Sequence, residues 1–127
     1  MSHPLITRLT TEFGWPRFED MGSLEDWRAG PGAHVLFVPG DPVRNLETAD
    51  VAVILPELRQ AFQGRFDCAV CGDGIEEQVR NETKVFKTPS LIFWRAGEMI
   101  GAVPKVRDWD DYMARVAHIL SLPVAAE

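Results

Sequence analysis

The sequence lacks long apolar runs and clusters of basic residues. Its longest apolar run, residues 51–55, is far too short to cross a bilayer, and the N-terminus has no run long enough for a secretory signal peptide. The 13 Lys and Arg residues are spread along the chain against 19 Asp and Glu, which gives a net charge of −6. These features argue against membrane insertion and nucleic-acid binding, and they predict a cytoplasmic protein.

Cysteine is scarce as well, because Cys68 and Cys71 are the only two in the chain. They have a Cys-x-x-Cys spacing but lie in a segment that reads as a strand. Strand residues three apart point to opposite faces, with Cα atoms about 10 Å apart, whereas a disulfide requires Cα atoms within about 7 Å. No helix N-terminus precedes these thiols to lower their pKa. The spacing favours two reduced, buried cysteines over a redox pair.

Residues suited to metal or nucleotide binding are also few. His3, His34 and His118 stand singly, so Cys68 and Cys71 have no second ligand pair for zinc. Residues 72–74, Gly-Asp-Gly, lack the third glycine and the spacing of a nucleotide-binding motif. We therefore predict no metal and no cofactor.

The remaining composition is that of an ordinary globular protein, with 46% apolar and 25% charged residues. The sequence predicts one domain over residues 1–127, with a helical extension over about residues 1–18 and a frayed tail over about residues 121–127. Periodicity predicts helices over residues 5–13, 23–28, 49–63, 75–81 and 109–120. It predicts strands over residues 18–21, 33–38, 65–71, 91–94 and 99–103. This order favours an α/β fold with a mixed sheet covered by helices on both faces.

Three details of these helices depend on single residues. Ser23 and Thr48 have the side chains of N-caps, so each is predicted to precede the first turn of its helix. Trp109 falls on the predicted core face of the last helix. Pro56 lies inside the long helix, where it removes a backbone hydrogen bond and predicts a kink.

The clearest local pattern is in residues 85–98. Residues 91–94 are all large and apolar, which predicts a buried strand, and Pro89 stands at its start, where a missing backbone donor is tolerated. The step Ala96-Gly97 then breaks the run, and residues 99–103 resume a strand pattern. Together they predict a β-hairpin introduced by Thr88-Pro89.

The proline-kinked helix and the Thr-Pro hairpin together resemble the thioredoxin fold, a three-layer sandwich, over about residues 20–121. The resemblance implies that Thr88-Pro89 is a cis peptide. It also exposes a departure, because a thioredoxin has a Cys-x-x-Cys that begins eight residues before the kinking proline. Here that segment reads Thr48-Ala49-Asp50-Val51. Dithiol exchange therefore has no thiols at this position.

A thioredoxin-like chain without these cysteines resembles the HupG/HyaE hydrogenase-expression family. The shared features are residues 50–58, the early Pro-Gly-Asp turn and the hairpin sequence Thr-Pro-Ser-Leu-Ile-Phe. The resemblance implies a non-catalytic assembly chaperone for the nickel-iron uptake hydrogenase. Its expected partner is the small-subunit precursor with its twin-arginine signal peptide.

The resemblance also suggests how such a protein binds without catalysis. The backbone of Thr88 would pair with an extended partner peptide by strand addition. Ala49, Val51 and Pro89 would form an apolar floor, and Glu47 and Asp50 at the rim would meet arginines. The predicted partner-binding residues are those of the helix start and the Thr-Pro step: Thr48, Ala49, Asp50, Val51, Thr88 and Pro89.

Two alternatives remain open at the level of sequence. One is a thiol-disulfide oxidoreductase that uses Cys68 and Cys71. The other is an interaction module of a different pathway that shares only the fold. Residues 51–55 also leave a choice open, because five apolar residues in a row point in every direction around a helix. Some of them pack the core, and others must face outward.

Overall fold

The computed structural model describes residues 3–121 and contains one five-stranded mixed sheet with the strand order β1-β3-β2-β4-β5. Its strands are β1 (Arg17–Phe18), β2 (Ala33–Val38), β3 (Phe66–Cys71), β4 (Ser90–Arg95) and β5 (Glu98–Pro104). β1 and β2 both run parallel to β3, whereas β4 is antiparallel to β2 and to β5. The predicted hairpin is therefore the β4–β5 pair. The first strand, predicted over residues 18–21, is the two-residue β1 at Arg17–Phe18.

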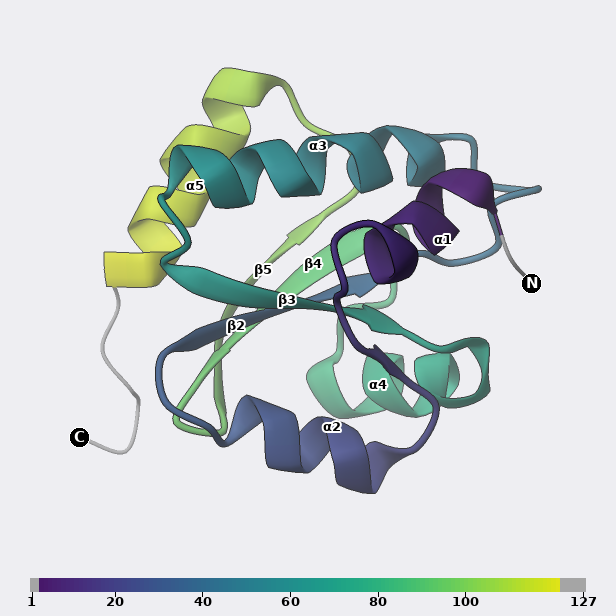
Figure 1. Cartoon of the computed structure of the whole chain (residues 1–127), viewed down its shortest axis with the longest axis horizontal. Helices are drawn as coiled ribbons and strands as arrows, with labels where there is room; N and C mark the ends of the chain where they lie inside the picture. The colour runs from purple at the N-terminus through teal and green to yellow at the C-terminus, as the bar shows by residue number, and fades with distance from the viewer. Residues whose placement is uncertain (1–2, 122–127) are drawn as a thin grey trace.

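Helices cover both faces of this sheet, as Figure 1 shows: α1, α3 and α5 lie on one face, and α2 and α4 lie on the other. The helices are α1 (Pro4–Thr11), α2 (Met21–Arg28), α3 (Glu47–Ala61), α4 (Glu76–Thr83) and α5 (Trp109–Ser121). A short 3₁₀ turn, η1 (Asp73–Ile75), leads into α4. Among residues 3–121, no helix is both long and apolar enough to span a membrane.

The sheet separates two hydrophobic clusters, and β2 contributes to both because its side chains alternate between the faces. Val35 and Phe37 pack with α1, α3 and α5, whereas Leu36 and Val38 pack with α2 and α4. Every residue of β2 is buried. A central strand covered on both sides explains why its sequence is apolar without alternation.

Three predictions about the helices are wrong. Asp20, not Ser23, caps α2: its carboxylate accepts the backbone N–H of Ser23 at 2.8 Å. α3 begins at Glu47 after Leu46, which provides no side-chain cap, so Thr48 lies inside the first turn. Trp109 is 42% exposed at the start of α5, because the core face begins one turn later at the buried Tyr112.

The N-terminal segment that the structure describes packs into the core of the domain. α1 buries Ile6 and Leu9 in the same cluster as α3, and the following Arg17 pairs with Val70 of β3. The predicted N-terminal extension is therefore built into the core. Ser121 is the last residue of α5, and the rest of the predicted tail lies outside the described residues.

Candidate binding site

The predicted site lies at one end of the sheet, where β2 and β3 end and β4 begins. A cavity of about 700 Å³ opens there between the loop after β2, the start of α3, α4 and the Thr88-Pro89 step. Its lining is mostly polar and consists of Gly40, Asp41, Arg44, Asn45, Leu46, Glu47, Glu76, Arg80, Thr88 and Lys105. The fold therefore brings Leu46 and Glu47, at the start of α3, to the same cavity as Thr88, which is the one residue of the predicted six among the described lining residues.

Thr88-Pro89 is a cis peptide, as the resemblance implies. Thr88 is half-buried and Pro89 is buried. Gly40 makes this close packing possible, because a Cβ atom there would come within 2.4 Å of the Thr88 hydroxyl oxygen, and its φ is +74°. A side chain at position 40 would displace Thr88.

The carbonyl of Thr88 already has partners within the chain. It accepts a hydrogen bond from the Asn45 side-chain amide and another from Lys105 Nζ at 3.3 Å. An added peptide strand requires free backbone groups along the edge that it joins. Strand addition at the Thr88 carbonyl would therefore have to displace both donors. Side chains around the cavity are more accessible to a partner than this carbonyl is.

The start of α3 is more deeply buried than predicted. Thr48 is fully buried, and its hydroxyl donates to the Pro39 carbonyl at 2.7 Å. Val51 is 1% exposed, so the prediction that it forms part of an exposed groove floor is wrong. Of the predicted residues Thr48 to Val51, only Ala49, half-buried, and Asp50, exposed, reach the surface.

The two rim carboxylates differ in their availability. Glu47 accepts the Val106 backbone N–H at 3.0 Å and lies 3.6 Å from Lys105 Nζ. The backbone hydrogen bond, supported by Lys105, lowers the pKa of Glu47. Asp50 is exposed and forms no ion pair with any residue in the described part of the chain. Of the two, Asp50 is the carboxylate free to meet a basic partner.

A third carboxylate, Glu76 of α4, was not predicted from the sequence. It accepts the Gly40 backbone N–H at 3.3 Å and lines the cavity together with Arg80. Burial raises the pKa of Glu76, although the hydrogen bond from Gly40 and the charge of Arg80 oppose that rise. Glu76 thus ties the loop after β2 to α4 and helps to shape the cavity.

Three exposed apolar side chains lie on the two segments that contribute Leu46 and Thr88 to the cavity lining, and we call them together the apolar rim. Its members are Val43, 68% exposed, Leu46, 82% exposed, and Phe86, 55% exposed. They lie in polar stretches without periodicity, so no helix or strand pattern indicates them. The available sequence signal was an isolated large apolar residue between polar neighbours, such as Leu46 between Asn45 and Glu47.

Neither cysteine is among the residues that line this cavity, and the two lie on opposite faces of β3, as predicted. Cys68 packs in the cluster with α3, and Cys71 packs in the cluster with α2 and α4. Both are buried, and burial raises the pKa of the Cys68 thiol and raises that of Cys71 from its ordinary 9.0 to about 12. Such thiols are poor nucleophiles. Within residues 3–121, no group of three or more His, Cys, Asp or Glu side chains is placed to hold a metal ion.

Comparison with known proteins identifies the family of this chain. Residues 5–112 match the family model described as hydrogenase-1 expression protein HyaE. The chain belongs to the HyaE family. It is 62% identical over 120 residues to the hydrogenase expression/formation protein HupG of Rhodobacter capsulatus, covering 94% of this chain and 87% of that one. HoxO of Cupriavidus necator, also a hydrogenase expression/formation protein, is 38% identical over 96% of this chain and 76% of its own.

Solved structures place the HyaE-family chain in the predicted fold class. The crystal structure of a hydrogenase expression/formation protein hupG from Rhodopseudomonas palustris matches with a TM-score of 0.59 and 34% identity, over 84% of this chain and 95% of that one. Mitochondrial thioredoxin 3 from Saccharomyces cerevisiae matches with a TM-score of 0.65 at 14% identity, over 87% and 97% of the two chains. The predictions of a thioredoxin-like fold and of the hydrogenase-expression family are both confirmed.

Proposed function

We propose that this protein takes part in hydrogenase maturation as a non-catalytic assembly chaperone. The observation that carries the proposal is the α3 turn beside cis-Pro89. Where a thioredoxin has two thiols, this turn has Thr48 and Val51, and both are buried. Membership of the HyaE family indicates the process, hydrogenase maturation. The described lining of the cavity has no cysteine, which favours a binding role over thiol exchange.

The proposed partner is the small-subunit precursor of a nickel-iron uptake hydrogenase, with its twin-arginine signal peptide, in the cytoplasm. The apolar rim suits the hydrophobic stretch of such a peptide, because exposed apolar side chains gain most when a partner covers them. Asp50 offers a carboxylate to arginine beside that rim. In this proposal Thr88 lines the cavity and Ala49 lies half-buried beside Asp50, while the buried Pro89, Thr48 and Val51 support the site from the core.

The test is binding of purified precursor to the wild-type protein and to Leu46→Asp. Leu46 is 82% exposed, so the substitution leaves the core intact while placing a charge in the apolar rim. We expect affinity to fall by about tenfold or more, which corresponds to at least about 1.4 kcal/mol. Isothermal titration calorimetry with precursors that have and lack the signal peptide measures the change. Val51→Asp is unsuitable, because a charge at a buried position would unfold the chain.

Met99→Asp is the matched control, since Met99 is an exposed apolar residue, 39% exposed, on β5 and away from the cavity. It should bind the precursor like the wild type. Equal binding by Leu46→Asp and wild type would refute the apolar rim as the contact. Absence of precursor binding by the wild-type protein would refute the proposed partner.

A further inference from the structure

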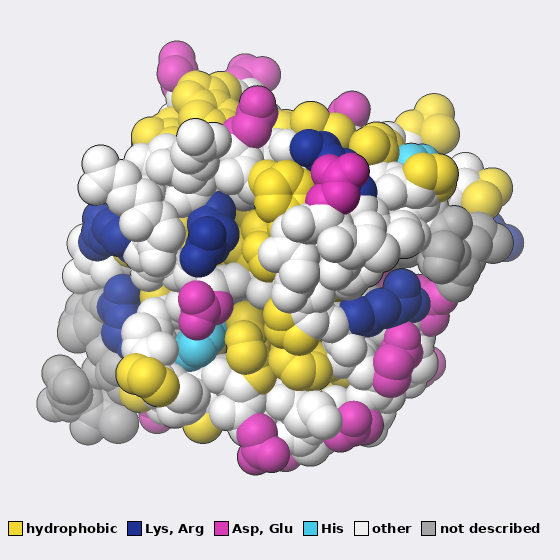
Figure 2. Space-filling view, in the orientation of Figure 1, with side chains coloured by type: hydrophobic (Ala, Val, Ile, Leu, Met, Phe, Trp, Pro, Cys, Tyr) yellow, Lys and Arg dark blue, Asp and Glu magenta, His cyan; other side chains and the backbone are white. Residues whose placement is uncertain are grey.

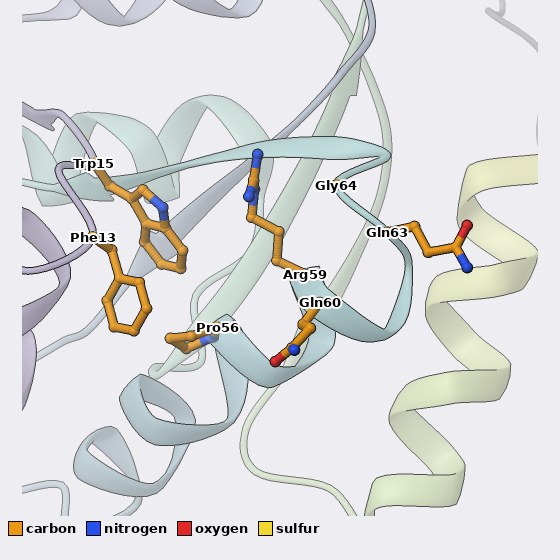
Figure 3. A pocket seen from close by; sticks show the side chains of 7 residues that line it. All are labelled: Phe13, Trp15, Pro56, Arg59, Gln60, Gln63 and Gly64. Atoms are coloured by element: carbon orange, nitrogen blue, oxygen red, sulfur yellow. The ribbon is translucent and has the colours of Figure 1, made fainter.

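A second pocket lies on the side of α3 away from the Thr88-Pro89 cavity. It has a volume of about 490 Å³ and lies between the segment after α1 and the C-terminal half of α3. Figure 3 shows its lining residues, which are Phe13, Trp15, Pro56, Arg59, Gln60, Gln63 and Gly64. We call it the Arg59 pocket. Thr48 and Arg59 are eleven positions apart in α3, about 16 Å along a helix axis, so the two sites are separate.

One wall of the Arg59 pocket is aromatic. Phe13 and Trp15 have ring centroids 5.4 Å apart, and Arg8 lies over the Phe13 ring at 5.0 Å. Phe13 is nevertheless 40% exposed, and the Pro56 ring faces it from α3 (Figure 3). Figure 2 shows hydrophobic side chains at the surface between α3 and the segment that follows α1. The wall is thus an apolar surface that remains open to a partner.

Among the described residues, Arg59 is the only charged one that lines this pocket. Its Nε donates to the Phe66 carbonyl at 3.1 Å, which fixes the guanidinium at the back of the pocket. No carboxylate among residues 3–121 forms an ion pair with Arg59. A guanidinium has five N–H donors in a planar fork, so most of them remain for an anion. In a chain of net charge −6, an arginine without an acidic partner beside open aromatic rings is a distinctive combination.

The rest of the lining suits a polypeptide. Gln60 is exposed at the pocket's edge, and its amide group both donates and accepts, which matches the N–H and C=O groups of a peptide backbone. The Gln63 side chain points away from the aromatic wall, toward α5 (Figure 3). We propose that the Arg59 pocket docks a partner-protein segment in which an Asp or Glu adjoins a large apolar residue. The apolar residue packs on Phe13, Trp15 and Pro56, and the carboxylate forms a charge-assisted pair with Arg59. This site is independent of the proposed precursor-binding surface.

The experiment uses the whole chain and a capped peptide, acetyl-Gly-Leu-Glu-Phe-Leu-Gly-amide, with a second peptide that has Gln in place of Glu. Titration is followed by the NMR signals of the Trp15 indole N–H and of the Gln60 and Gln63 amides. We expect the acidic peptide to shift these signals at up to millimolar concentration, and the Gln peptide to bind roughly tenfold more weakly. Arg59→Gln should reduce the preference for the acidic peptide to within about twofold.

Two variants separate a binding role from a structural one. Arg59→Lys keeps the positive charge but loses the Nε bond to the Phe66 carbonyl. If the charge binds the peptide, Arg59→Lys should retain binding within about threefold. If Arg59 is needed only for that structural bond, Arg59→Gln and Arg59→Lys should both lose binding. Arg65→Gln removes the same charge from an exposed residue outside the pocket and should bind like the wild type. The proposal is overturned by equal binding of the two peptides to the wild type. It is equally overturned if no pocket signal shifts, or if these signals depend only on protein concentration, as a second copy seated on the pocket would cause.

Discussion

Thr48 shows how the chain uses a position that a thioredoxin gives to its nucleophile. The residue faces inward from the first turn of α3, and its hydroxyl bonds the Pro39 carbonyl at the end of β2. This bond joins the helix start to the loop that carries Val43 and Leu46 of the apolar rim. Where a thioredoxin has a reactive thiol, this chain has the Thr48 hydroxyl, which holds the start of α3 against the end of β2 beside the cavity.

Thr48→Val should therefore destabilise the protein although the two side chains have nearly the same shape. The valine leaves the buried Pro39 carbonyl without its donor, and an unsatisfied buried group costs about 1–3 kcal/mol. Urea unfolding followed by circular dichroism measures the loss. Thr48→Ser keeps the hydroxyl and loses one methyl group, so its cost should stay below about 1 kcal/mol. A valine variant as stable as the wild type would show that this bond contributes nothing.

At the scale of elements, the sequence predicted the strands and helices well but not the rotational phase of α3. Residues 51–55 are all apolar, so periodicity does not select an inward face. The structure starts the helix at Glu47, and the buried positions Thr48, Val51, Ala52, Leu55 and Leu58 then fall at helical spacing on one face. Val53, 40% exposed, is the one that faces outward. An N-cap at Thr48 was chemically reasonable, but tertiary packing decided otherwise.

The loops explain the rest of what the sequence did not reveal. Cis-Pro89 and the hairpin were predictable from the family pattern. The partners of the Thr88 carbonyl, by contrast, come from Asn45 and from Lys105, which are 43 and 17 positions away. Such contacts depend on the tertiary arrangement of segments that have no periodicity of their own. For the same reason the apolar rim and the Arg59 pocket only become visible in the folded chain.

α2 and α4 are joined on their shared face by a bidentate ion pair between Arg28 and Glu82, with N–O distances of 2.7 and 3.1 Å. The arginine also lies over the Trp94 ring at 5.2 Å. The hydrogen bond from Arg28 lowers the pKa of Glu82. A carboxyl group whose pKa is lower in the folded state stabilises the fold above its unfolded pKa and loses that contribution as the pH falls.

Glu82→Gln should therefore lower the free energy of unfolding at pH 7 by about 1 kcal/mol, a modest value because the Glu82 side chain is 41% exposed to solvent. The difference from the wild type should shrink as the pH falls below about 4.5 and protonates the carboxylate. Urea titrations at a series of pH values test this. Asp111→Asn, which breaks the exposed Asp111–Arg115 pair on α5, is the control and should cost less. A Glu82 effect that does not depend on pH would contradict the ion-pair explanation.

At the scale of the whole molecule, the N-terminal segment completes both the core and the surface. α1 closes the cluster over α3, and β1 adds a parallel strand beside β3. The segment between them supplies Phe13 and Trp15, the aromatic wall of the Arg59 pocket. The N-terminal segment lies outside the thioredoxin resemblance. It supplies the aromatic wall of the Arg59 pocket, and it also packs against α3, whose start lies at the apolar rim.

Leu9→Ala tests whether this segment and the rest of the chain fold as one unit. Leu9 is fully buried in the cluster that includes α3, so the substitution should cost about 2–5 kcal/mol through lost burial and the cavity that remains. Unfolding should stay a single cooperative transition, because α1 shares its core with the sheet. Thr11→Ala, at an exposed position of the same helix, should change stability by less than about 0.5 kcal/mol. Two separate transitions, or a Leu9 effect as small as that of Thr11, would mean that the N-terminal segment is an independent attachment. In that case the Arg59 pocket would have no fixed aromatic wall.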